Sequence, residues 1–342
     1  MRPRSTLFCI LLLLLQGFSF GQAPSSTPND NLTTIHVSSQ LVLLDALVEN
    51  KKTGKLVENL QQPDFRLSED GVPQTITYFS QDRLPLSVVF LFDLTDTVRS
   101  ALKPLAEGAR EILGHLKPED EVAIMVFSSH TELLQNFTRD RTRAADAIVK
   151  ASTMESKDGT FIHECMYEAV RQAMKSTTPD SRRVLIWLTD GTANYQNNMT
   201  RKTLAKDAPA RLHTKEEATA ELLHSGVVVS GLIDQTVATK LDVIASNANP
   251  FAMMFGARTG DIRRYAALTG GPVLDTSKQE VADRLAMLID QIRLRYTLGY
   301  KPSTRKPAGT FCKLQLRLDP AALKARPDLR EVKVSTREGY FR

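Results

Sequence analysis

The feature that most constrains the fold is an alternation of apolar runs and amphipathic segments between Leu86 and Leu294. The run LSVVFLF, Leu86 to Phe92, is continuously apolar, as is typical of a central strand in a parallel sheet. Strands that alternate with helices predict a parallel sheet covered by helices on both faces. We therefore predict an α/β fold with a doubly wound, mostly parallel sheet. The other expected strands are Glu121–Ser128, Arg182–Asp190, Gly226–Ile233 and the short Gly271–Asp275.

Helical spacing of apolar residues appears between these strands. The segment His130–Phe137 follows the second strand too soon for a crossover helix, so we expect it to be an antiparallel edge strand. The expected helices are Arg99–Leu116, Thr142–Ala151, Ile162–Lys175, Lys215–His224, Asp261–Leu268 and Lys278–Leu294.

Alternating β patterns precede and follow this unit. In Phe65 to Ser80, the triplet Glu69-Asp70-Gly71 predicts a hairpin turn between two alternating runs. Similar patterns return after Arg295. We therefore predict a small β-sandwich built from an N-terminal segment, residues 32–84, and a C-terminal segment, residues 296–342, with the α/β domain, residues 85–295, inserted between them.

The N-terminus has the pattern of a cleavable signal peptide. Arg2 and Arg4 precede an apolar run from Leu7 to Leu15, and Ser19-Phe20-Gly21 offers small residues for cleavage. A membrane anchor is the alternative, but the run is short for a bilayer and ends in Gln16-Gly17. We expect residues 1–21 to be removed, residues 22–31 to be a linker, and the protein to be secreted, periplasmic or on the cell surface, without a membrane span.

The charge of the chain excludes one class of partner, and its cysteines allow two states. Cleavage removes two arginines and no acidic residue, which lowers a formal net charge of +5 by two. The remaining cations are interleaved with acids, so we expect no nucleic-acid partner. Cys165 and Cys312 remain after cleavage and are either two buried thiols or a disulfide. Nothing in the sequence indicates an oligomeric state.

Polar side chains stand at the ends of two expected parallel strands, Leu86–Phe92 and Arg182–Asp190. Asp93, Thr95 and Thr97 come directly after the first of these, and Asp190 ends the second. In an open parallel sheet, ligands bind at the carboxyl ends of the strands. Thr160 follows a glycine and precedes a helix. Hard oxygen donors from three loops predict a divalent cation, preferably Mg²⁺, with Ca²⁺ or Mn²⁺ as alternatives. The alternative is that these residues are ordinary helix caps and turn residues.

These three loops resemble the metal-ion-dependent adhesion site (MIDAS) of von Willebrand factor A domains. The resembling elements are Asp93-x-Thr95-x-Thr97, Gly159-Thr160 and Thr189-Asp190-Gly191. The resemblance implies that Thr95 and Thr97 bind the metal directly, that Thr160 does so when ligand is bound, and that Asp93 and Asp190 act largely through waters. The flanking stretches PDFRLSEDGVPQTITYFS, RYTLGYKP and TREGYF are similar to those of secreted proteins with a von Willebrand A-related domain of acidobacterial type.

The site departs from the family pattern at two positions. The usual first element is D-x-S-x-S, whereas threonine stands at both positions here and adds a methyl group with a stiffer χ1. We expect serine at either position to bind metal equally or more tightly. Asp96 adds a carboxylate that either faces solvent or favours the larger Ca²⁺.

Other motifs point away from catalysis. No G-x-S-x-G elbow follows an expected strand, and the sequence holds neither H-E-x-x-H nor a phosphate-binding loop. His163-Glu164 has no second histidine four residues on, so we interpret it as a surface pair. Because no nucleophile with a base emerges, we expect the protein not to be an enzyme.

Two functions remain open. The first is a secreted, metal-dependent binding or adhesion module that captures an acidic side chain of a protein ligand. The second is a structural or assembly domain with a degenerate metal site, in which the β unit makes the contacts.

Overall fold

The computed structural model describes residues 41–81, 84–156, 160–190, 211–234 and 260–342. All of them belong to one compact unit, Gln40–Arg342. The expected signal peptide and linker lie outside the described residues. None of the described helices is both long and apolar enough to cross a membrane.

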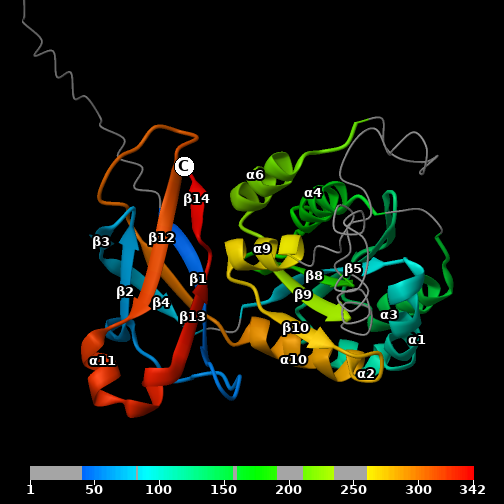
Figure 1. Ribbon diagram of the computed structural model, residues 1–342, viewed down its shortest axis with the longest axis horizontal. Coiled ribbons are helices and arrows are strands. Elements are labelled where there is room, and N and C mark those ends of the chain that lie inside the picture. Colours follow the sequence, from blue (N-terminus) through cyan, green and yellow to red (C-terminus); the bar gives the residue numbers. More distant parts are fainter. Residues whose placement is uncertain (1–40, 82–83, 157–159, 191–210, 235–259) are drawn as a thin grey trace, which may run out of the picture. The chain divides into compact units, whose positions relative to one another are not determined.

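A six-stranded sheet forms the centre of the α/β domain (Figure 1). Its strand order is β10-β9-β8-β5-β6-β7, and every pairing is parallel except that of β6 with β7. The predicted fold class, including the antiparallel edge strand, is confirmed. The strands are β5 (Leu86–Asp93), β6 (Glu121–Phe127), β7 (Thr131–Thr138), β8 (Arg182–Thr189), β9 (Val228–Asp234) and β10 (Val273–Thr276).

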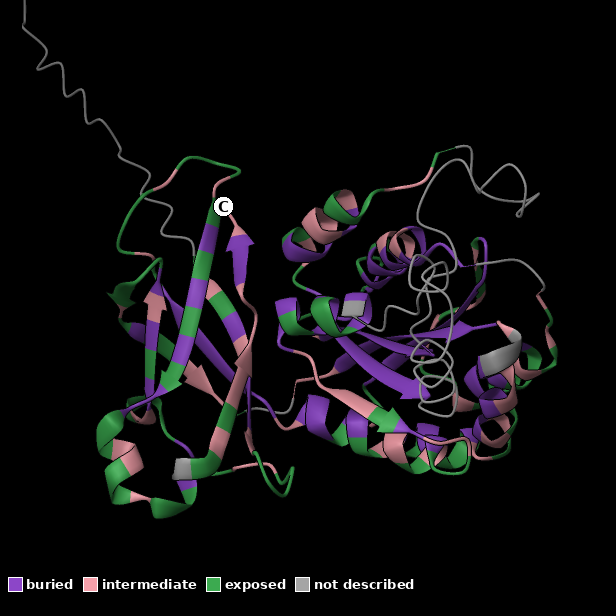
Figure 2. Ribbon diagram, in the orientation of Figure 1, coloured by how far each residue is buried: buried purple, intermediate pink, exposed green. Residues whose placement is uncertain are grey.

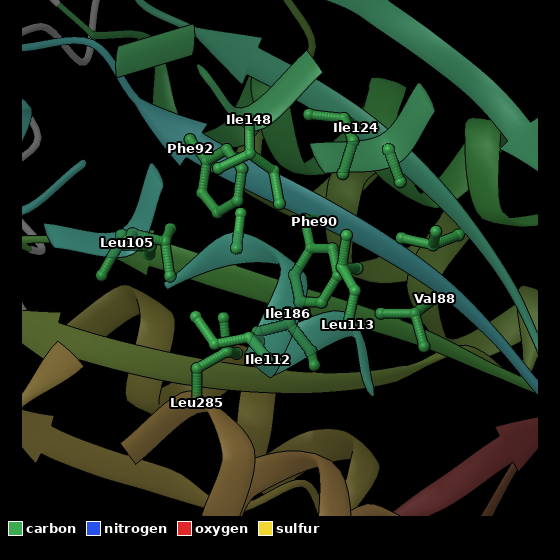
Figure 3. Packing of buried hydrophobic residues seen from close by; sticks show 14 of the residues in the cluster. Val88, Phe90, Phe92, Leu105, Ile112, Leu113, Ile124, Ile148, Ile186 and Leu285 are labelled. Atoms are coloured by element: carbon green, nitrogen blue, oxygen red, sulfur yellow. The ribbon is translucent and has the colours of Figure 1, made fainter. Parts of the chain in front are cut away.

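Strand β5 lies between β8 and β6, and all of its residues are buried. Its alternate side chains enter two separate hydrophobic clusters, one on each face of the sheet. Figure 3 shows Phe90 and Phe92 in the first cluster, packed among side chains of the helices that cover this face. A strand with helices on both faces needs an apolar residue at nearly every position, which is why the sequence run is continuous.

The helices divide between the two faces. One face carries α1 (Asp96–Glu107), α2 (Ala109–Gly114), α3 (Arg141–Thr153) and α10 (Val281–Arg293), and the other carries α4 (Ile162–Ala173), α6 (Lys215–Ser225) and α9 (Gly260–Thr269).

The single helix expected over Arg99–Leu116 is in fact two helices. It breaks at Gly108, which ends α1 and precedes α2. Pro104 lies inside α1 and Gly108 four residues later, and both residue types are poor helix formers. The break therefore has a local cause in the sequence.

The flanking segments form a β-sandwich with its own core. Its two four-stranded sheets have the orders β13-β1-β11-β4 and β14-β12-β2-β3, and both contain strands from each end of the chain. Figure 2 shows the alternation of buried and exposed residues along β12. The strands are β1 (Val42–Asn50), β2 (Phe65–Glu69), β3 (Val72–Gln74), β4 (Ile76–Ser80), β11 (Tyr296–Tyr300), β12 (Phe311–Leu318), β13 (Val332–Thr336) and β14 (Gly339–Phe341). Three short helices accompany them: η1 (Gln62–Asp64), α11 (Pro320–Ala325) and η2 (Pro327–Glu331).

The hairpin turn at Glu69-Asp70-Gly71 joins β2 to β3, as predicted. Asp70 and Gly71 have φ values of 49° and 83°, the left-handed backbone that tight hairpins need. The segment after the turn, however, forms two strands that belong to different sheets. It is interrupted at Thr75: β3 pairs with β2, whereas β4 pairs with β11 in the opposite sheet.

Candidate metal centre

The end of β5 lies beside the end of β8 at the carboxyl edge of the central sheet. The two strands pair in parallel, with Phe92 opposite Leu188. Asp93 is the last residue of β5, and Asp190 directly follows β8. Parallel pairing therefore brings the first and third predicted loops to one place.

The Asp93 carboxylate is held by hydrogen bonds from both loops. Its Oδ1 accepts the backbone N–H of Thr95 at 2.9 Å, and its Oδ2 accepts the Thr189 hydroxyl at 2.8 Å. Thr95 is the N-cap residue of α1, but its hydroxyl turns toward Asp93 and makes no capping bond. The first loop is therefore organised around the carboxylate.

Burial and a neighbouring charge perturb this carboxylate. Asp93 is 1% exposed, and Asp190 is also buried. Burial, followed by the charge of Asp190, raises the pKa of Asp93 to about 7, although the hydrogen bonds from Thr95 and Thr189 act in the opposite direction. Two acidic groups close together in a buried site favour a divalent cation, which would lower this pKa again.

The second loop reaches the same region through helix α4. Thr160 is fully buried and stands two residues before α4. In the first turn of α4, burial and then the charge of Asp93 raise the pKa of the Cys165 thiol well above its usual value. The Cys165 thiol donates to the carbonyl of Ser128, just after β6, at 3.8 Å. The start of α4 thus lies beside the ends of β5 and β6.

Four of the five residues predicted to form the site have described side chains. Asp93, Thr95 and Asp190 come together, and Thr160 begins the segment that leads into α4. Thr97 lies in the first turn of α1, but its side chain and that of Asp96 lie outside the described part of the chain.

The structure adds two residues to which the sequence analysis gave no role at the site. The Thr189 hydroxyl holds Asp93, and Asp234 ends β9 at the same edge, fully buried. Asp234 stands at the end of an apolar strand, as Asp93 does, and that position is the signal that could have identified it.

The interpretation of His163-Glu164 as a surface pair is wrong. Glu164 is buried, and its Oε2 accepts the backbone N–H of His213 at 2.7 Å and contacts its ring Nδ1 at 2.9 Å. His163 contacts the Tyr265 hydroxyl at 2.9 Å through Nδ1. Both partners are distant in the sequence, so local spacing could not reveal them.

Cys165 and Cys312 are free thiols, and both are buried. Cys165 lies in α4 and Cys312 in β12, in different hydrophobic clusters. The alternative of a disulfide between them is excluded in this structure.

The central part of the chain is similar to a known domain family. Residues 88–192 match the family model of the von Willebrand factor type A domain. No curated protein matches the chain.

Several solved structures are similar to the chain. The vWF domain of the type V pili tip protein Mfa5 from Porphyromonas gingivalis is 12% identical, with a TM-score of 0.42, over 61% of this chain and 95% of that one. The conserved hypothetical protein BatB from Bacteroides thetaiotaomicron is 15% identical, with a TM-score of 0.40, over 60% and 98%. A von Willebrand factor type A structure from Catenulispora acidiphila is 12% identical, with a TM-score of 0.41, over 77% and 71%. Similarity at this level carries no information about ligands or partners.

Proposed function

We propose that the part of the chain that matches the von Willebrand factor type A domain, residues 88–192, is the centre of a metal-dependent binding module. The metal is Mg²⁺, with Mn²⁺ or Ca²⁺ as the alternatives, at the carboxyl edge of the central sheet. The ligand is a protein that presents an acidic side chain to the metal. The residues proposed to hold the metal are Asp93, Thr95, Thr97, Thr160 and Asp190.

The observation that carries this proposal is that the Asp93 and Asp190 carboxylates are buried at the adjacent ends of β5 and β8. Burying two carboxylates together costs free energy unless a cation or a proton offsets the charge. The other donors nearby are threonine hydroxyls, and such hard oxygen ligands suit Mg²⁺ better than a soft metal. The donor set therefore fits a hard divalent cation.

Each residue has a proposed role at the metal. Thr95 and Thr97 would bind through their hydroxyls, and Thr160 would join when the protein ligand is bound. Asp93 and Asp190 would supply charge largely through bound waters. One coordination position would then remain for the partner's carboxylate, as Mg²⁺ sites usually keep several exchangeable waters.

We propose binding and not catalysis because the nearby groups that could act as nucleophile or base are otherwise engaged. Burial and the charge of Asp93 raise the pKa of Cys165, which keeps this thiol protonated and unreactive. The Thr189 hydroxyl donates to Asp93. We further propose that residues 1–21 are a signal peptide and that the protein acts outside the cell.

One observation favours the alternative, an assembly domain that makes contacts through the β unit. Leu43 in β1 and Tyr78 in β4 are exposed apolar side chains of one sheet, and the exposed Leu41 directly precedes β1. Leu43 and Tyr78 flank Gly299, where an added Cβ would meet a side-chain atom of each at 2.9 Å. Exposed apolar groups that lie together are a feature of contact surfaces.

Calorimetric titration of Mg²⁺, Mn²⁺ and Ca²⁺ into the protein beginning at Gln22 tests the proposal. We expect binding by the wild type, none by Asp93→Ala, and equal or tighter binding by Thr95→Ser. The control Asp146→Ala changes an exposed aspartate on α3 and should bind normally. At a metal concentration 100 times the Kd, the folded state should gain about 2.7 kcal/mol.

The same samples distinguish the alternative. If the wild type shows neither heat nor a rise in Tm with any of the three metals, the metal-dependent function is wrong. Self-association of that protein, measured by sedimentation velocity and lost in Leu43→Ser, would then favour the assembly domain.

A further inference from the structure

A second group of metal-ligating side chains lies in the β-sandwich. Glu69 ends β2, Asp70 begins the following turn, and Cys312 lies in β12. One ligand atom from each of the three lies within 4.8 Å of the others. None of them belongs to the candidate centre at the edge of the central sheet.

Strand pairing brings these residues together. Strand β12 is antiparallel to β2, with Leu314 opposite Glu69. The Asp70 N–H donates to the Lys313 carbonyl at 2.8 Å, and Asp70 Oδ1 accepts the Lys313 N–H at 3.1 Å. The Asp70 carboxylate is therefore fixed next to Cys312 by the backbone of β12.

One oxygen of Glu69 has an unusual environment. Glu69 is 2% exposed, and its Oε2 accepts the hydroxyls of Tyr300 and, at 3.0 Å, Tyr340. Its Oε1 is buried and accepts no hydrogen bond from the described residues. A buried carboxylate oxygen without a donor is costly, and a bound ion or water is the usual explanation.

We propose that Glu69, Asp70 and Cys312 bind a divalent transition-metal ion such as Zn²⁺. A thiolate sulfur and two carboxylate oxygens are ligands that Zn²⁺ takes in proteins, usually in tetrahedral geometry. Water would take the fourth position. The sulfur ligand disfavours Mg²⁺ and Ca²⁺, which prefer oxygen, so this site and the candidate centre select different metals.

Lys306 shows that this position attracts a cation. Its ammonium group is bonded to Asp70 Oδ2 and lies 3.9 Å from Glu69 Oε1. Lys306 lies in the segment between β11 and β12, and its side chain is partly exposed. A metal ion would enter from this side, displace the ammonium group and bond to Glu69 Oε1.

Metal binding also requires the Cys312 thiol to lose its proton. Burial and then the charge of Glu69 raise the pKa of this thiol, so the metal-free protein keeps it protonated. Binding releases that proton to water as the sulfur–metal bond forms, and affinity therefore rises with pH. The bound metal would tie the β2–β3 turn to β12.

Titration of Co²⁺ and Zn²⁺ into the protein beginning at Gln22, which lacks Cys9, in the presence of Mg²⁺ tests this site. Co²⁺ bound to a thiolate gives a sulfur-to-cobalt charge-transfer absorption band. We expect the wild type to develop this band at one equivalent and Zn²⁺ to abolish it by competition. Cys312→Ser should lose the band, and Glu69→Gln should weaken Co²⁺ binding by about tenfold or more.

Lys306→Met gives a prediction of opposite sign. Because it removes the competing ammonium group, it should tighten Co²⁺ binding severalfold without disturbing a ligand. Three variants serve as controls and should keep the band: Cys165→Ser, Asp93→Ala, and His213→Ala. The last disrupts another group, Glu164, Glu168 and His213, which offers no sulfur.

A wild-type protein that is folded by circular dichroism but develops no band overturns the proposal, as does a band that persists in Cys312→Ser. If Cys312→Ser does not fold, alkylation of Cys312 in the Cys165→Ser protein replaces that arm. Zn²⁺ should slow this alkylation at least about tenfold, and an unchanged rate would overturn the proposal. Because Asp93→Ala leaves this site intact, failure here is distinguishable from failure of the proposed function.

Discussion

At the scale of single residues, Asp93 connects the fold to the proposed function. It is the last residue of a fully buried strand, and hydrogen bonds from two loops fix both of its oxygens. Burial, followed by the charge of Asp190, raises the pKa of this fixed carboxylate. The same restraint prepares it to support a cation without rearrangement.

The pKa of Asp93 predicts how the metal-free protein responds to pH. Because the folded-state pKa, about 7, lies above the unfolded value of 3.8, the stabilising contribution is complete below pH 3.8 and is lost as pH rises through 7. In EDTA, denaturant unfolding should show a free energy of unfolding that falls by a few kcal/mol from pH 5 to pH 8.

Asp93→Asn is the matched variant for this response. It cannot ionise, so its unfolding free energy should lose this slope and exceed that of the wild type at pH 8 in EDTA. Mg²⁺ should flatten the wild-type profile at pH 8 by binding the ionised form. Parallel profiles for the wild type and Asp93→Asn would contradict the assigned pKa.

At the scale of elements, the turn between α9 and β10 depends on close backbone contact with β13. Gly270 has a φ of +72°, and a Cβ added there would lie 2.5 Å from the Thr336 carbonyl carbon. The Glu338 N–H donates to the Leu268 carbonyl at 2.9 Å in the same region. Only a residue without a side chain allows this approach.

Gly270→Ala should therefore lower the free energy of unfolding by two effects: the strain of a positive φ and the overlap of the new Cβ with the backbone of Thr336. Gly54→Ala is the matched control, because Gly54 has a φ of +66° but nothing within 4 Å of an added Cβ. We expect about 1–2 kcal/mol of lost stability for Gly54→Ala. A loss no larger for Gly270→Ala, measured by denaturant unfolding, would show that the turn tolerates a side chain.

At the scale of the whole molecule, an ion pair joins the β-sandwich to the central sheet. Arg182, the first residue of β8, donates to both carboxylate oxygens of Asp45 in β1, at 2.7 and 3.2 Å. Arg182 also donates to the Ile292 carbonyl at 2.8 Å, and the Thr297 hydroxyl donates to Asp45 at 2.9 Å. The pair therefore links four elements from distant parts of the sequence.

Removing one partner of this pair should be costly. Asp45→Ala leaves the Arg182 guanidinium buried without its carboxylate, and we expect a loss of about 3–5 kcal/mol in the free energy of unfolding. Glu331→Gln breaks the exposed Lys52–Glu331 pair and should cost at most about 1 kcal/mol. Similar losses for the two variants would show that the Asp45–Arg182 pair does not hold the units together.

Asp45 also predicts the acid response of this junction. Burial alone would raise its pKa, but the charge and hydrogen bonds of Arg182 bring it below 3.8. Its contribution to stability is therefore present above pH 3.8 and is lost as pH falls below that value. Acid unfolding measured by circular dichroism should shift to higher pH in Asp45→Asn.

The sequence by itself determined the elements and their class. Apolar periodicity reports which face of a segment is buried, so the parallel strands, the edge strand at Thr131–Thr138 and the turn at Asp70-Gly71 could be predicted locally. The position of Asp93 and Asp190 after two apolar strands likewise predicted that they meet at one edge, because parallel strands share their carboxyl ends.

Only the tertiary structure decided which distant groups meet. Glu164 contacts His213, β4 pairs in the opposite sheet, and Glu69 and Asp70 lie beside Cys312. The physical reason is that a polar group in a folded chain is paired through contacts between residues far apart in the sequence. Periodicity along the chain identifies the buried apolar face of each element, but the packing of the elements determines which polar residues are buried and which atoms face them.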